Sequence, residues 1–239
     1  MALVDPTPFS RRRFLTWTAV GGIVPAVAAA ACARDTGRSL TANRSPGPVV
    51  ALPSVAAATQ VSLQAALLSR RSVRSFTSEA VTPEAVSVLL WAAQGITHDG
   101  RLRTAPSAGA LYALEMYAAL PDTTVRYVPD GHRAQTWAST DLRPALADAS
   151  GRQDSLVHAP LVVVVTTTWS RLASRYGVRA ARFADMEAGH ATQNLLLQAV
   201  ALRLGAVCVG SFDDGAVADV LDLPDGEEAR YLVAVGHPA

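Results

Sequence analysis

The stretch that decides the fold reads EAGHATQNLLL at residues 187–197, and LGAVCVGSF follows it at residues 204–212. Apolar residues recur at helical spacing through the first segment, and leucine, alanine and valine lie on nearly all sides of its second half. A helix that is apolar all round must be buried. We therefore expect a long buried helix over residues 180–204, followed by a strand over residues 206–210.

Elements of both kinds surround this helix in the sequence. Helical periodicity covers residues 62–70. Thr82 followed by Pro83 marks the start of a helix that reaches about Gln94, because threonine caps helices and proline suits their first position. Apolar and β-branched runs predict strands over residues 114–120, 125–128, 161–167 and 231–235. The fold class is therefore α+β, without an internal repeat.

The composition limits the chemistry of the chain. Its 239 residues are half hydrophobic, which fits one packed domain with a tail. The net charge of +1 gives no reason to expect nucleic acid as a partner. All 21 basic residues are arginine. Since a guanidinium stays protonated, the positive groups of this protein can bind anions but cannot serve as bases.

The N-terminus has the pattern of a twin-arginine export signal. Residues 10–16 read SRRRFLT, and a weakly apolar, alanine-rich run over residues 15–31 follows, too short for a membrane span. We expect residues 1–32 to be a signal peptide for the twin-arginine export machinery. The alternative is a weak anchor helix that stays attached. Because this route moves folded proteins, typically with a cofactor, the signal favours a bound redox group and a periplasmic or membrane-anchored location outside the cytoplasm.

The cleavage point has two candidate forms. Three alanines before Cys32 approximate a lipobox, which would acylate Cys32 and anchor the protein to a membrane, whereas the Ala-x-Ala patterns suit ordinary cleavage. The lipid anchor is favoured, because Cys208, the other cysteine, lies far away in an apolar run. Residues 33–48 are polar and rich in Gly, Ser and Pro, which predicts a flexible tether before a domain over residues 49–239.

Two further motifs carry candidate chemistry. RRSVRSF at residues 70–76 offers several guanidinium groups and a hydroxyl within one turn, which suits a phosphate monoester; the alternative is a solvated basic helix end. RTAPSAGALY at residues 103–112 lets the backbone approach a flat ligand, with Ser107 free to hydrogen-bond to it; the alternative is an ordinary tight turn. The five histidines have no metal-ligand spacing, so no metal site is expected.

The order of these motifs, together with LLWAAQGI at residues 89–96, resembles the nitroreductase superfamily. Within it, the chain is most similar to the branch related to azoline dehydrogenases, which form thiazoles and oxazoles in peptides. The similarity runs from about Val49 to Pro238. The resemblance implies a nitroreductase-like fold with a central mixed β-sheet flanked by helices. It also implies an obligate homodimer with the long buried helix and FMN at its interface, and a hydride transfer between NAD(P)H and a small-molecule substrate.

The resemblance also assigns cofactor-binding residues by position. Arg70, Ser72 and Arg74 would hold the FMN phosphate, with Arg71 beside them. Pro106 and Ser107 would reach the isoalloxazine from the other subunit, and Glu187, Ala188 and Gly189 would line the flavin near N5. Gly210 and Ser211 would lie close to the ring or the phosphate.

Arg175 and Tyr176 are the candidate catalytic residues, in place of the Lys-Tyr pair of azoline dehydrogenases. Tyr176 can donate or accept a proton, whereas Arg175 can only orient groups and stabilise charge. The leading hypothesis is an exported FMN-dependent oxidoreductase that acts on a quinone, a nitro compound or a similar conjugated acceptor. One alternative is an azoline-type dehydrogenase of a peptide or natural-product heterocycle. The other is a lipoprotein that binds flavin without turnover.

Overall fold

The computed structural model describes residues 47–55, 61–98 and 102–239. The expected signal peptide over residues 1–32, with Cys32, lies outside the described residues, as does most of the expected tether. The last two tether residues are described: Gly47 donates a backbone hydrogen bond to Thr136, and Pro48 accepts one from it. In the described part of the chain, no helix combines the length and the apolar character needed to cross a membrane.

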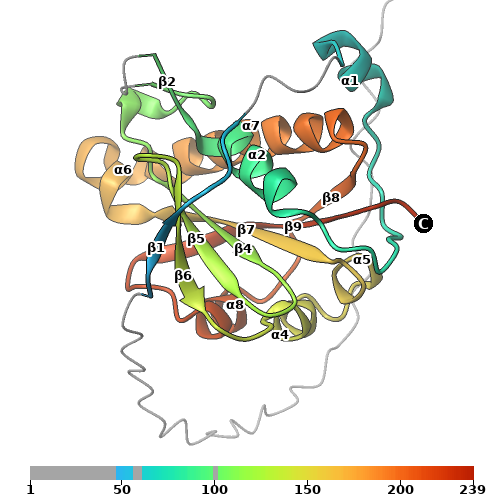
Figure 1. Ribbon diagram of the computed structural model, residues 1–239. Coiled ribbons are helices and arrows are strands. Elements are labelled where there is room, and N and C mark those ends of the chain that lie inside the picture. Colours follow the sequence, from blue (N-terminus) through green and yellow to red (C-terminus); the bar gives the residue numbers. More distant parts are fainter. Residues whose placement is uncertain (1–46, 56–60, 99–101) are drawn as a thin grey trace, which may run out of the picture. The chain divides into compact units, whose positions relative to one another are not determined.

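A seven-stranded sheet forms the middle layer, in the order β1-β6-β5-β4-β7-β9-β8 (Figure 1). The strands are β1 (Val49–Ala51), β4 (Leu114–Ala119), β5 (Thr124–Val128), β6 (Arg133–Ala138), β7 (Leu161–Thr168), β8 (Gly205–Val209) and β9 (Glu227–Gly236). The expected mixed sheet is antiparallel in each pairing between these strands. A parallel contact occurs as an isolated bridge between Ser72 and Ala206. A separate hairpin pairs β2 (Ile96–Thr97) with β3 (Leu102–Arg103).

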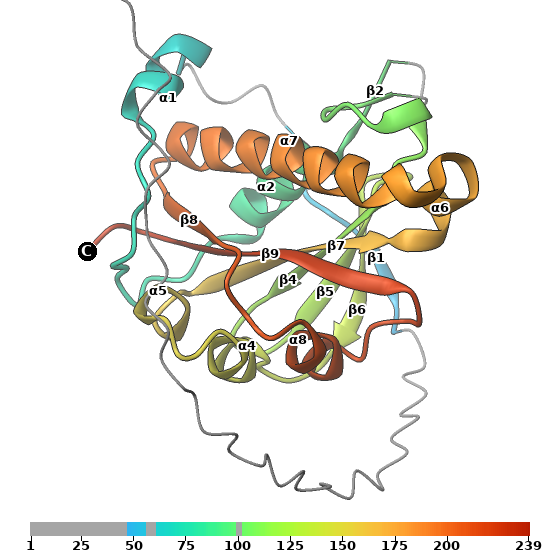
Figure 2. The same cartoon turned by 180° about the vertical axis from the view of Figure 1, so that it is seen from behind.

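Helices cover both faces of the sheet (Figures 1 and 2). One face carries α2 (Pro83–Gln94) and α7 (Ala180–Ala201). The other carries α4 (Arg143–Ala149), α5 (Asp154–Val157) and α8 (Asp214–Leu221). The remaining helices are α1 (Leu63–Ser69), α6 (Trp169–Tyr176) and the short 3-10 turns η1 (Ala108–Ala110) and η2 (Gly177–Arg179).

Strand β7 joins the two halves of the core. It is buried from Leu161 to Thr167, as its continuous β-branched run predicts for a central strand covered on both faces. Because successive side chains point to opposite faces, Val163 packs into the cluster with Leu195 of α7. Its neighbour Val164 packs into the opposite cluster with Leu146 of α4.

Helix α7 is shorter and less evenly buried than the sequence predicts. It ends at Ala201, because Arg203 adopts a left-handed backbone with φ of +61° and the Leu204 N–H bonds to the Ala199 carbonyl. One side is buried along the sheet, whereas Met186 on another side is 52% exposed. In this single chain α7 therefore buries a stripe rather than its whole circumference.

Candidate functional site

The arginine segment over residues 70–76 meets the outer edge of β8 at Ser72 and Val73, and then pairs at Phe76 with the chain that follows β9. The Arg70 N–H closes α1 by donating to the Ala66 carbonyl at 2.9 Å. Ser72 then forms its bridge with Ala206, and the Val73 N–H donates to the Ala206 carbonyl at 3.1 Å. These backbone contacts fix the arginine side chains beside the first residues of β8.

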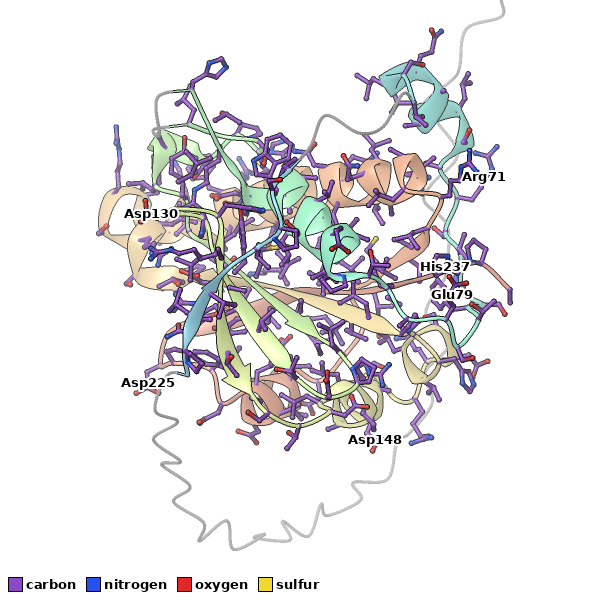
Figure 3. The ribbon with its side chains drawn as sticks, in the orientation of Figure 1. Arg71, Glu79, Asp130, Asp148, Asp225 and His237 are labelled. Carbon is purple, nitrogen blue, oxygen red and sulfur yellow. The ribbon has the colours of Figure 1, made fainter. Side chains whose placement is uncertain are left out.

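The three arginines of this segment keep their charge available. Arg71 donates to the carbonyls of Leu68 and Arg70 at 2.9 and 2.8 Å, and Arg74 donates to the Ser72 carbonyl at 3.3 Å. None of the ion pairs formed by the described residues involves Arg70, Arg71 or Arg74. Figure 3 shows Arg71 at the base of α1, at the edge of the molecule. The segment can therefore bind an anion without breaking an existing ion pair.

A cavity of about 680 Å³ opens beside this segment. Its wall includes Arg74 on one side, Cys208 and Val209 of β8 on another, and residues of α5 opposite. Cys208 is exposed, and Gly210 and Ser211, which follow the end of β8 at Val209, are exposed as well. The Ser211 carbonyl accepts a hydrogen bond from Gln153 at 2.9 Å. The volume lies within the range of small-molecule sites, about 300–1,000 Å³.

Ser107 and Glu187 form a second group of candidate residues. The Ser107 hydroxyl donates to Glu187 Oε2 at 2.7 Å and accepts from the Tyr112 N–H at 2.9 Å. Pro106 is exposed next to it, and Ala188 is buried. A Cβ added to Gly189 would meet no atom within 4 Å, so α7 presents open backbone there. Glu187, Ala188 and Gly189 lie in the first half of α7. The hydrogen bond between Ser107 and Glu187 holds the loop that carries Ser107 beside them.

Glu187 is a buried carboxylate with an incomplete set of partners. Its residue is 1% exposed, and its Oε1 has no hydrogen-bond partner. Burial is the largest influence and raises the pKa of Glu187 above its usual value, because the charged form loses water. The Ser107 hydroxyl, the Arg103 charge and the backbone N–H groups of Leu114 and Ala113 act in the opposite direction without cancelling it.

Arg175 and Tyr176 lie against the same loop. The Tyr176 ring packs edge-on against Phe183 with ring centroids 4.6 Å apart. Gly109 has a φ of +62°, and a Cβ on it would lie 2.7 Å from Tyr176 Oη and 3.0 Å from a terminal nitrogen of Arg175. The structure therefore brings the candidate catalytic pair together with the Ser107 loop.

These two groups of candidate residues lie at opposite ends of α7. The helix rises about 21 Å from Glu187 to Ala201, at 1.5 Å per residue. The arginine segment meets the start of β8, just beyond the second of these ends. One chain therefore does not bring Arg70, Arg71, Ser72 and Arg74 together with Pro106, Ser107, Arg175 and Tyr176.

A third cluster was missed in the sequence. Glu115 Oε1 accepts from Arg171 at 2.6 Å, and Glu115 Oε2 pairs with Arg126 at 2.9 Å. Both arginines and Arg103 line a cavity of about 380 Å³. The available signal was a charged residue inside each of two expected strands, Glu115 in residues 114–120 and Arg126 in residues 125–128.

Comparison with known proteins decides the family. The sequence profile of the nitroreductase family matches residues 67–237, which include both groups of candidate residues.

The chain belongs to the nitroreductase family.

Relatives agree with this family. A protein of Methanocaldococcus jannaschii, named as a nitroreductase, is 34% identical over 183 residues, 74% of this chain and 91% of its own length. A solved structure from Ralstonia eutropha JMP134, also named as a nitroreductase, is 29% identical with a TM-score of 0.73 and covers 81% of this chain and 93% of that one. One from Anabaena variabilis is 25% identical with a TM-score of 0.71, covering 81% of this nitroreductase and 42% of its own chain. The expected nitroreductase fold is confirmed.

Proposed function

We propose that this nitroreductase is an exported, FMN-dependent oxidoreductase that works as a homodimer on a small conjugated acceptor such as a quinone or a nitro compound. The observation that carries the proposal is the separation of the two groups of candidate residues along α7. A two-fold related copy would set the Ser107 loop of one chain against the Arg74 cavity of the other. Two chains would then build two complete sites from parts that each chain holds apart.

Exposed leucines support the pairing of two chains. Leu63, Leu67 and Leu68 of α1 are 67%, 54% and 70% exposed. A helix of seven residues is marginal on its own in water, and its stability must come from packing. A second copy that covers these leucines would supply that packing and would bury an apolar surface that monomers rarely expose.

The residues present fit FMN. Arg70, Arg71 and Arg74, which form no ion pair with another described residue, and the Ser72 hydroxyl would hold its phosphate by charge-assisted hydrogen bonds. Gly210 and Ser211 would lie along the flavin, and the second chain would contribute Pro106, Ser107 and Glu187–Gly189. When bound, FMN supplies the two-electron hydride chemistry of the reaction. The protein places the group, excludes water and presents proton donors; a quinone would gain two electrons and two protons in all.

The electron donor follows from the proposed location. NAD(P)H is the donor that the family resemblance implies, but nicotinamide cofactors are scarce outside the cytoplasm. A membrane carrier or another protein would then take its place. The export proposal rests on residues 10–16 and the lipid anchor on Cys32. Mass spectrometry of the mature N-terminus tests both: an acylated Cys32 supports the anchor, and an intact Met1 in the exported fraction contradicts cleavage.

A second candidate function, an azoline-type dehydrogenase, is favoured by the position of Tyr176. Its hydroxyl lies beside Gly109, in the loop that carries Ser107, where it could hold or accept a substrate proton. The charge of Arg175 beside it would stabilise a developing anion. Tyr176→Phe should lower the turnover of an azoline-type substrate without changing the flavin content. An unchanged rate would show that Tyr176 takes no part in the reaction.

Cofactor content tests the main proposal directly. The purified protein should show flavin absorbance, and release of free FMN on denaturation would identify the group. The double substitution Arg70→Ala/Arg74→Ala should strip the flavin, because two of three phosphate-binding cations are lost. Arg133→Ala/Arg152→Ala removes the same charge from a half-buried and an exposed arginine elsewhere, and this variant should keep its flavin. A colourless wild-type protein would overturn the proposal, and flavin that no donor reduces would favour a binding protein without turnover.

A further inference from the structure

The cavity between β3, β4, β5 and α6 is rich in positive charge. None of the proposed FMN-binding residues lines it. Its volume is about 380 Å³, and Arg103, Arg126 and Arg171 all contribute to its wall. The aromatic residues Tyr112 and Tyr127 line it as well. It is thus a small concave space with cationic and aromatic walls.

Two of the three arginines share one carboxylate. Glu115, which is 7% exposed, accepts from Arg171 on one oxygen and from Arg126 on the other. Arg171 also donates to the Tyr112 carbonyl at 3.0 Å. One negative charge therefore holds two guanidinium groups in fixed positions, which leaves positive charge in excess.

Arg103 has no carboxylate in direct contact among the described residues. It donates to Gln94 Oε1 at 2.8 Å, and its guanidinium lies 4.8 Å from the centre of the Tyr112 ring. Burial is the largest influence on the pKa of Arg103 and lowers it, and the nearby Arg171 acts in the same direction, whereas Glu115 and Glu187 raise it. Arginine nevertheless stays charged near neutral pH, so a partly dehydrated cation lines the cavity.

The remaining acidic group at the cavity already has a partner. Asp130 pairs with Arg133 at 3.1 Å and has an 88% exposed side chain. Figure 3 shows Asp130 at the edge of the molecule, on the side opposite Arg71. Asp130 therefore does little to offset the charge of Arg103, and an anion in the cavity would supply the missing counter-charge.

We propose that this cavity binds the carboxylate of a small conjugated substrate, with Arg103 and Arg171 recognising its charge. The inference rests on the proposed function, because it names the substrate class of the proposed flavin-dependent reaction. The Tyr112 N–H bonds to the Ser107 hydroxyl, so the cavity begins where the proposed ring-contacting loop ends. Planar guanidinium groups match a planar carboxylate, and the tyrosine rings match a conjugated body.

Calorimetry on the flavin-loaded protein tests the anion site apart from turnover, because bound FMN occupies the phosphate site. The probes are benzoate, its neutral counterpart benzamide, and inorganic phosphate. Benzoate should bind about tenfold or more tightly than benzamide, the factor expected for a charged hydrogen bond, and more tightly than phosphate. Phosphate as the stronger ligand would overturn the assignment to a carboxylate.

Substitution of Arg103 locates the site. Arg103→Gln should weaken benzoate binding about tenfold or more. Arg103→Lys keeps the charge without the planar guanidinium and should weaken benzoate binding less. If circular dichroism shows that Arg103→Gln does not fold, the benzoate affinity of Arg103→Lys tests the proposal. Arg152→Gln is the matched control, since Arg152 is exposed and pairs with Asp148 outside the cavity. If both Arg103 variants bind benzoate as tightly as the wild type does, the proposal is overturned.

Turnover gives the second measurement. A quinone carboxylic acid and its methyl ester share one ring and differ in charge. The ratio of the KM of the ester to the KM of the acid should exceed about ten in the wild type and fall toward one in Arg103→Gln. Equal KM values in the wild type would overturn the inference but not the proposed function. If the bound flavin, reduced beforehand with dithionite, passes its two electrons to neither quinone, the proposed function is contradicted, while calorimetry still tests the anion site.

Discussion

Glu187 shows how one residue can link stability to pH. Its raised pKa means that the folded protein holds this proton more tightly than the unfolded chain does. The stability contributed by this proton is full below the ordinary carboxyl pKa. It is lost as the pH rises toward the raised value.

Glu187→Gln should therefore change the pH profile. The free energy of unfolding of the variant should rise relative to wild type as the pH rises above the ordinary carboxyl pKa, by about 1.4 kcal/mol for each unit of pKa difference removed. Urea unfolding at a series of pH values measures this difference. Asp185→Asn removes an exposed carboxylate from the same helix and serves as the control substitution. A profile for Glu187→Gln that runs parallel to wild type would show that Glu187 does not titrate differently on folding.

At the scale of elements, the contact between η1 and α6 depends on Gly109. Its left-handed backbone and the closeness of Tyr176 both exclude a side chain. Gly109→Ala should destabilise the protein by more than about 1 kcal/mol, the cost of the backbone alone, and urea unfolding measures the loss.

Gly151→Ala provides the comparison for this substitution. Gly151 has a similar φ of +71°, but a Cβ there would meet no atom within 4 Å. Gly151→Ala should therefore lower the free energy of unfolding only by the backbone contribution. The additional loss in Gly109→Ala should become smaller when Tyr176→Phe removes the hydroxyl. Equal losses at both glycines would mean that the Ser107 loop does not touch Tyr176.

The elements differ in how far the sequence predicts them. Helix α2 follows the prediction from Pro83 to Gln94, because the Thr82 cap is a local signal. The end of α7 does not, since the left-handed Arg203 is set by the contacts that turn the chain into β8. Strand β6 went unpredicted because RAQTWA has no β-branched run and owes its form to pairing with β5 and β1.

The site follows the same rule. Each motif of neighbouring residues, such as Arg70–Arg74, could be found by its chemistry. The cluster of Arg103, Arg126 and Arg171 could not, because three distant segments meet only in the folded chain. Nor does a single sequence show that Ser107 and Arg74 end up far apart within one chain.

For the whole molecule, the proposed dimer makes flavin binding depend on association. Leu67→Asp places a charge on the exposed face of α1 and should shift the protein toward monomers with loss of flavin, as sedimentation and absorbance would show together. Val50→Asp, at 53% exposure against 54% for Leu67, changes an equally exposed position on β1. If both variants stay dimeric, or if both dissociate, α1 is not a specific part of the interface.

The bridge between Ser72 and Ala206 has a consequence beyond cofactor placement. Strand β8 is an edge of the sheet, and edge strands offer unpaired N–H and C=O groups to other chains. The arginine segment covers this edge at Ala206 through Ser72 and Val73, and its charges repel a second segment of the same kind. The segment therefore also protects the Ala206 end of β8 from pairing with another chain, and we expect a change that detaches it from β8 to promote such pairing.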